Sequence, residues 1–132
     1  MVKLIKTSGK RKKAVARAVL KSGKGVVKIN NYLIELYQPS MARLKLQEPL
    51  ILAGDISKGV DVSIDVDGGG YMAQAEAARL ALAKALAQHS KKLEKIFLDY
   101  DRHLLVADVR RKETHKPNTH GKARSKRQKS YR

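Results

Sequence analysis

The chain has 132 residues, a formal net charge of +17, 42% hydrophobic residues and no cysteine. This length predicts one compact domain with room for an appended arm, and the lack of cysteine excludes disulfides and thiolate metal sites. A cysteine-free chain also fits a reducing cytosol. No run of about 18 apolar residues occurs, so we expect no membrane-spanning helix, and residues 1–6 lack the apolar centre of a signal peptide.

The positive charge is concentrated at the two ends of the chain. Residues 1–24 contain nine Lys or Arg and no acid, and residues 109–132 contain ten Lys or Arg and one acid, Glu113. Residues 25–108 are nearly neutral, with ten basic and eleven acidic residues. Two cationic ends of this size repel each other unless a polyanion neutralises them. The charge pattern therefore predicts a globular middle whose two ends bind a polyanion.

Several segments show the pattern of β-strands. In residues 14–21, Ala or Leu recurs at every second position, which is the period of a strand with one buried face. The Gly-Lys-Gly turn at residues 23–25 predicts that residues 26–29 return as the second strand of a hairpin. Residues 60–66 form the clearest strand, because Val and Ile alternate with Asp and Ser. We expect a last short strand at residues 103–107.

Helices are expected in three segments. A short helix covers residues 41–47, with Ser40 at its cap and with Pro49 ending or kinking it. A long helix covers residues 72–89 and contains eight alanines, whose small side chains favour the helix and allow it to lie close against a sheet. Residues 91–98 form a further helical stretch.

The chain changes character after Val109, because no Val, Ile, Leu, Met or Phe follows. Residues 110–132 bury too little apolar surface to offset the entropy of ordering them, so we expect a disordered cationic segment in the free protein. Fully extended, it would reach roughly 70–80 Å at about 3.3 Å per residue. We call residues 1–109 the body, expected to be a globular α/β domain that binds RNA, and residues 110–132 the arm.

Two patterns admit more than one interpretation. The cations of residues 10–13 and Arg17 either bind phosphates or form a solvated strand end. The lack of nearby acids favours phosphate binding, which fixes position and does not read bases. The three glycines at 68–70 either cradle a phosphate at a helix start or form a tight turn that needs positive φ, and the two are compatible. They are not a nucleotide-binding P-loop, because the spacing GxxxxGK followed by Ser or Thr is absent.

Residue types that often bind metals have simpler interpretations here. The three aspartates within residues 61–67 fit the wet face of a strand, turned away from RNA, better than a hard-cation site. The four histidines show no ligand pattern, and His115 and His120 fit base stacking or phosphate contact better than metal binding. We expect Tyr131 either to stack on a base or to be disordered.

Three motifs occur together in this chain: GKRKKAVARA at residues 9–18, GGGYMAQ opening the Ala-rich segment at residues 68–86, and DxRxxExxKP at residues 108–117, followed by KAR at 122–124. Together they resemble the family of the universal small-subunit ribosomal protein nine, called protein sixteen in eukaryotes. The match in order and spacing covers nearly the whole chain. The glycine motif is its most specific part.

Two features depart from the pattern common in that family. Ala73 stands where many members carry Gly, which affects how closely the helix start approaches RNA. Residues 125–132 differ from the bacterial ending, of which only the terminal Arg carries over. They resemble the archaeal and eukaryotic branch, and the lack of a long N-terminal extension favours an archaeal member.

The resemblance implies an α+β two-layer fold, in which a four-stranded sheet is packed with helices, related to the second domain of ribosomal protein five. It also implies a structural role in translation, in the head of the small subunit of the cytoplasmic ribosome. The implied partners are small-subunit rRNA, neighbouring head proteins and, through the end of the arm, the peptidyl-site tRNA. We expect no enzymatic activity, cofactor, bound metal, membrane partner or homo-oligomer.

The charge pattern and the resemblance together identify candidate site residues. The candidates for rRNA binding are cations from both ends and the three glycines: Lys10, Arg11, Lys12, Lys13, Arg17, Gly68, Gly69, Gly70, Arg110, Arg111, Lys112, Lys116, Lys122, Arg124, Lys126 and Arg127. The candidates for tRNA binding are Lys129, Tyr131 and Arg132. Arg132 is favoured because a guanidinium grips phosphate in a bidentate manner.

Two rival functions belong to other classes. A nucleotide-dependent enzyme would use the glycine-rich helix start, but it also needs convergent polar groups, which residues 25–108 do not supply. A chromatin-type protein would coat DNA through the two cationic ends. That hypothesis predicts comparable affinity for duplex DNA and rRNA.

Overall fold

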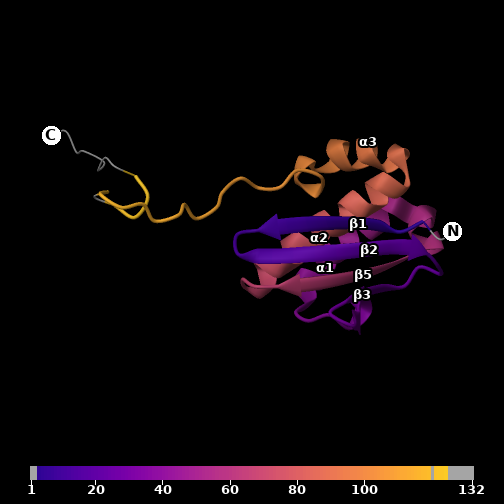
Figure 1. The fold of residues 1–132 in the computed structure, drawn as a ribbon. Coiled ribbons are helices and arrows are strands. Elements are labelled where there is room, and N and C mark those ends of the chain that lie inside the picture. Colours follow the sequence, from indigo (N-terminus) through magenta and orange to yellow (C-terminus); the bar gives the residue numbers. More distant parts are fainter. Residues whose placement is uncertain (1–2, 120, 125–132) are drawn as a thin grey trace.

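The computed structural model describes residues 3–119 and 121–124, and it shows a five-stranded sheet with helices packed on one face (Figure 1). The strands are β1 (Ile5–Arg11), β2 (Ala14–Ser22), β3 (Val27–Ile29), β4 (Tyr32–Leu33) and β5 (Val60–Asp67). The helices are α1 (Ser40–Ala53), α2 (Tyr71–His89) and α3 (Lys91–Tyr100), with short 3-10 turns η1 (Ile34–Leu36), η2 (Gly54–Gly59) and η3 (Arg102–Leu104). The expected two-layer α/β class is confirmed, although the sheet has five strands instead of four.

The sheet order is β1-β2-β5-β3-β4, so the predicted hairpin between residues 14–21 and 26–29 is wrong. β2 pairs antiparallel with β1 and with β5, whereas β3 pairs parallel with β5. The Gly-Lys-Gly turn does reverse the chain, but β5 enters between the two segments. Asp61 of β5 holds that turn, because its Oδ1 accepts hydrogen bonds of 2.9 Å from the backbone N–H groups of Lys24 and Val26.

The first strand, β1, was not predicted, because its residues show no apolar alternation. Its inward positions are Ile5, Thr7, Gly9 and Arg11, and only the first of these is a hydrophobic residue. The strand is fixed by α2 instead. The Thr7 hydroxyl donates to the carbonyl of Ala81 at 2.7 Å. A side chain on Gly9 would collide with the backbone of α2, so this glycine allows the helix to lie directly against the strand.

The core lies between the sheet and α2, as the Ala-rich sequence predicted. Nine residues of α2 are buried, six of them alanines. They face the inward Ala and Leu of β2 and the inward Val and Ile of β5. Phe97 and Leu93 of α3 close one side of this core. In the part of the chain that the structure describes, no helix has the length and apolarity needed to cross a bilayer.

Two predicted elements need correction. α1 runs from Ser40 to Ala53, longer than expected, and Ser40 makes no capping hydrogen bond in the described chain because Pro39 occupies the cap. Pro49 does not end the helix but is buried within it. The strand predicted at residues 103–107 is wrong, because the chain there forms η3, which buries Leu104 and is capped by Asp101 through the His103 N–H at 2.9 Å.

Candidate nucleic-acid interface

Three segments that are distant in the sequence meet at one end of the sheet. They are the turn between β1 and β2, the glycine turn before α2, and the first residues of the arm, which runs away from the body past that end (Figure 1). Between them lies a groove of about 1110 Å³, which we call the basic groove, lined by Lys12, Lys13, Gly69, Gly70, Ala73, Arg110, Arg111, Lys112, Glu113, Thr114, His115 and Lys122. Six of these described lining residues are Lys or Arg and one is acidic, so the groove is suited to a polyanion.

Two of the three glycines in the turn before α2 are required by the backbone. Gly68 and Gly69 have φ values of 77° and 68°, a region that side chains rarely adopt. A side chain on Gly68 would also collide with the carbonyl of Lys13, and one on Gly69 would crowd Ala14. Gly70 is different, because its φ is −90° and a side chain there would meet no neighbouring atom. The tight-turn interpretation is therefore confirmed for the first two glycines.

The glycine turn also exposes the start of α2 to the groove. Gly70 is the N-cap and has no side chain to satisfy the first N–H groups of the helix. The side chain of Gln74 donates to the carbonyl of Gly68 at 3.1 Å and supports the turn without capping the helix. Ala73, the departure from the family pattern, lies in the groove lining. Open N–H groups and the helix dipole together favour an anion at this point.

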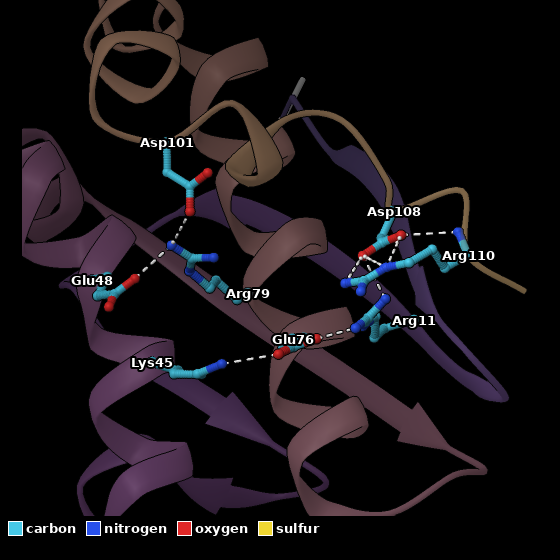
Figure 2. A network of polar contacts seen from close by, with 8 residues as sticks. All are labelled: Arg11, Lys45, Glu48, Glu76, Arg79, Asp101, Asp108 and Arg110. Carbon is cyan, nitrogen blue, oxygen red and sulfur yellow. Dashed lines mark hydrogen bonds and ion pairs between the residues drawn. The ribbon is translucent and has the colours of Figure 1, made fainter.

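Arg11 connects the body to the root of the arm (Figure 2). Its Nε donates to Oε2 of Glu76 at 2.6 Å, and its Nη1 forms an ion pair with Oδ2 of Asp108 at 2.6 Å without hydrogen-bond geometry. Lys45 of α1 binds the other oxygen of Glu76 at 2.9 Å. Burial raises the pKa of Glu76, but the hydrogen bonds and charges of Lys45 and Arg11 together lower it by more. The network thus joins β1, α1, α2 and the arm.

Asp108 fixes the first cation of the arm (Figure 2). Its carboxylate accepts hydrogen bonds from the backbone N–H of Arg110 at 2.9 Å and from Nη2 of the same residue at 2.8 Å. Hydrogen bonds from Arg110, and then the charge of Arg11, hold the pKa of Asp108 far below its usual range. The arm therefore leaves the body with Arg110 held at the edge of the basic groove.

A second set of ion pairs stabilises the neighbouring helices. Nη2 of Arg79 in α2 lies 2.6 Å from Oε2 of Glu48 in α1 and 3.2 Å from Oδ2 of Asp101, which follows α3. Burial raises the pKa of Asp101, but hydrogen bonds from the His103 N–H and Arg79, together with the positive charges of these two residues, lower it by more. These pairs lie outside the basic groove and hold α1, α2 and η3 together.

The described part of the arm folds back on itself. Oε1 of Glu113 lies 2.8 Å from Nη2 of Arg124, and the N–H of Lys116 donates to the carbonyl of Lys122 at 2.9 Å. This loop brings Lys122 to the groove lining. The pKa of Glu113 is lowered by its hydrogen bond to Arg124. Disorder of the arm in the free protein stays a prediction.

The predicted site residues divide into several groups. Lys12, Lys13, Gly69, Gly70, Arg110–Lys112 and Lys122 meet at the basic groove, and Lys116 and Arg124 form the arm loop. Gly68 lies in the turn behind the groove. Lys10 and Arg17 are exposed on the sheet face that the helices do not cover. The predicted residues that lie outside the described chain are Lys126, Arg127, Lys129, Tyr131 and Arg132.

Arg11 differs from the other predicted cations, because its side chain is only 15% exposed and faces two carboxylates. Its RNA-binding role stays a prediction, and its observed contacts are internal. Sequence reasoning missed the network that Arg11 forms with Glu76 and Asp108. The alternation of side chains along β1 could have revealed this network, because every second residue faces inward and Arg11 lies on the same face as Ile5 and Gly9.

The aspartates of β5 have two different environments. Asp65 and Asp67 are exposed on the uncovered sheet face, so the wet-face part of the prediction is confirmed. They are not segregated from the predicted RNA-binding cations, because Asp65 lies directly opposite Arg17 on the same face. Asp61 instead holds the turn before β3, and the hydrogen bonds from Val26 and Lys24 lower its pKa. Among residues 3–119 and 121–124, no three carboxylate, Cys or His side chains gather into a possible metal site.

Comparison with known proteins gives a consistent result. Residues 9–132 match the family described as ribosomal protein S9/S16. The chain is 49% identical to the small ribosomal subunit protein uS9 of Methanococcus maripaludis strain C7 over 134 aligned residues, which cover 99% of this chain and all of the relative. It is 48% identical to the protein of the same name from Methanococcus vannielii, with the same coverage.

Proposed function

Because the chain belongs to the ribosomal protein S9/S16 family, we propose that its basic groove and arm bind small-subunit rRNA through the phosphate backbone. As a member of this family it is a structural constituent of the small ribosomal subunit and works in translation, where its role is structural and not catalytic. The finer proposal concerns which surface binds which RNA. The observation that carries it is the convergence of the three cationic segments on one groove.

The composition of the groove favours phosphates over base edges. Lysines 12 and 13 extend from a tight turn, where Lys12 has a φ of 54°, and they lie beside the open N–H groups at the start of α2. Ammonium groups and backbone N–H groups fix the position of a phosphate backbone but carry little sequence information. Arg111 and Lys112, held next to Arg110, add charge from the opposite wall. Lys10 and Arg17 lie on the uncovered sheet face, which also carries Asp65 and Asp67, so the basic groove and not this face is the main cationic surface of the proposal.

The arm extends this interface away from the body. Residues 109–118 are exposed, so their cations are available to a partner. In the proposal the arm follows small-subunit rRNA in the head of the subunit, and Lys116, Lys122, Arg124, Lys126 and Arg127 contact phosphates along its path. The last residues, Lys129, Tyr131 and Arg132, would then reach the peptidyl-site tRNA. This final step is supported by the family resemblance and by the length and charge of the arm.

The groove proposal is tested by removing charge from the groove and from a control site. We expect Lys12→Gln with Lys13→Gln to weaken rRNA binding about tenfold, because two phosphate contacts are lost. The matched control is Lys91→Gln with Lys92→Gln, which removes the same charge from exposed positions on α3. The measurement is a filter-binding titration with small-subunit rRNA at one fixed salt concentration. Equal losses in both variants would show that net charge matters and the groove does not.

A competition experiment separates the proposal from general polyanion binding. Duplex DNA of equal length should displace the rRNA only at a much higher concentration, because the folded RNA presents phosphates that fit both the groove and the arm. Displacement at equal concentration would favour the chromatin-type function.

A further inference from the structure

The helix α1 is apolar on both of its faces. Ala42, Leu46, Pro49 and Ala53 point into the core and are buried. On the outward face, the exposed fractions are 63% for Met41, 57% for Leu44 and 74% for Ile51. A surface helix normally turns charged or polar side chains outward. Large apolar side chains on both faces are typical of a helix that is covered on both sides.

The exposed apolar surface continues onto the segment before this helix. Nη1 of Arg43 donates to the carbonyl of Glu35 at 3.0 Å, which places η1 against the first turns of α1. Exposed apolar side chains of β4 and η1 therefore lie near the start of the outward face. We call the following exposed residues the apolar corner: Tyr32, Leu33, Leu36, Met41, Leu44 and Ile51.

The charge of this region argues against RNA as its partner. Residues 29–57 contain two basic and three acidic residues, a net charge of −1 in a chain of +17. Both cations have internal partners, since Arg43 binds the Glu35 carbonyl and Lys45 binds Glu76. RNA binding without cations loses its main source of affinity. Clustered aliphatic side chains with few charges are instead typical of a protein interface.

We propose that the apolar corner binds an apolar surface of a neighbouring protein of the small ribosomal subunit. The inference rests on the proposed function, because the assembled subunit supplies the neighbour. A second copy of the chain is a poor partner, since each copy carries +17 and the two would repel each other. In this proposal RNA binds at the basic groove, and a neighbouring protein binds at the apolar corner.

The test places a photoreactive residue in the corner of the full-length chain. Leu44→p-benzoylphenylalanine is incorporated into small subunits, which are purified by sedimentation, irradiated and digested with ribonuclease. We expect a ribonuclease-resistant conjugate with one other protein of the subunit. A conjugate with RNA, a conjugate with a second copy, or no conjugate from subunits that contain the chain would overturn the inference. Failure of the chain to sediment with the subunits would overturn the proposed function instead.

A second variant links the conjugate to apolar contact. Leu36→Gln with Met41→Gln removes two apolar side chains that are exposed in the structure, so the fold should be preserved. We expect the conjugate yield from position 44 to fall about tenfold, as for central contacts of an interface. The matched control is Ile96→Gln with Leu98→Gln, which changes exposed apolar residues of α3. An unchanged yield in the corner variant would contradict the proposed contact.

Discussion

The body and the arm are held by different forces. In the body, α2 approaches β1 so closely that Gly9 has no space for a side chain, and the buried alanines leave little room between helix and sheet. In the described arm, residues 110–118 are exposed, and the main side-chain contacts are the pairs Arg110–Asp108 and Arg124–Glu113. Close packing therefore determines the fold of the body, whereas the charges of the arm are available for binding a partner. Changes in the two regions should therefore affect different measurements.

The largest effect on stability is expected at the closest contact of the body. A Cβ at Gly9 would collide with the backbone of α2, which cannot move aside without opening the core. We expect Gly9→Ala to lower the free energy of unfolding by about 3 kcal/mol, as for severe overpacking. The matched control is Gly59→Ala at the end of η2, where a Cβ meets no neighbouring atom, and the change should stay within about 0.5 kcal/mol. Urea denaturation measures both values, and equal losses would contradict the packing account.

Two arginine substitutions compare ion pairs in the two regions. Arg11→Met leaves Glu76 and Asp108 without their shared cation in a largely buried position. We expect a loss of about 2 kcal/mol in the free energy of unfolding, because two partly buried carboxylates each lose one of their two cationic partners. Arg124→Met breaks the exposed pair with Glu113 and should not change the unfolding transition. If the two variants lose equal stability, the arm is part of the folded unit.

The pH dependence of stability provides a smaller test of the same comparison. The pKa of Glu76 is lower in the folded protein than its ordinary value of 4.5. Ionised Glu76 therefore contributes to the free energy of unfolding at pH values above 4.5, and this contribution is lost as the pH falls toward the pKa of the folded protein. We expect the free energy of unfolding to decline below pH 4.5 and Glu76→Gln to flatten that decline. Glu113 also has a lowered pKa, but its pair with Arg124 is exposed to solvent and therefore weak, so Glu113→Gln should leave the profile nearly unchanged. Denaturation at several pH values measures this, and a flatter profile in the arm variant would contradict it.

The smallest effect is expected at the end of the arm. Removal of residues 129–132 should leave subunit assembly normal but weaken tRNA binding in the peptidyl site, and reading-frame or initiation fidelity should decline before bulk synthesis does. One charge-assisted contact contributes about 1.5–3 kcal/mol at most, and tRNA makes many other contacts. Filter binding of tRNA to subunits with the truncated and the full arm measures the difference. Equal affinities together with equal frameshift rates would leave the arm with an rRNA-binding role alone.

The sequence predicted the elements whose pattern is local. The alternation in β2 and β5 and the alanines of α2 identified these three elements to within two residues at either end. It failed where distant segments decide the structure. β1 has no apolar alternation and is fixed by α2, and β3 pairs with β5 instead of β2. Asp61 of β5 holds the turn before β3. The apolar run at residues 104–106 resembles a strand, yet Asp101 caps a 3-10 turn there.

In the candidate site too, the sequence predicted the features that depend on neighbouring residues and missed those that depend on distant segments. Local charge identified the cations of the basic groove, and the glycine motif identified two of its other lining residues, Gly69 and Gly70. The sequence could not show that Arg11 faces inward, because that depends on the pairing of β1 with β2. Nor could it show that Asp108 binds Arg11, since 97 positions separate the two residues. The position of the arm relative to the body therefore required the structure.

The most direct test of the account is the salt dependence of rRNA binding with and without the arm. Each phosphate contact contributes about 0.7–0.9 to the slope of log K against log salt concentration. If half of the nine net charges of residues 109–132 engage phosphates, deletion of residues 110–132 should flatten the slope by roughly three to four. The thermal unfolding transition of the body should stay cooperative and nearly unchanged. An unchanged slope, or a truncated body that no longer unfolds cooperatively, would contradict the division between a packed body and a binding arm.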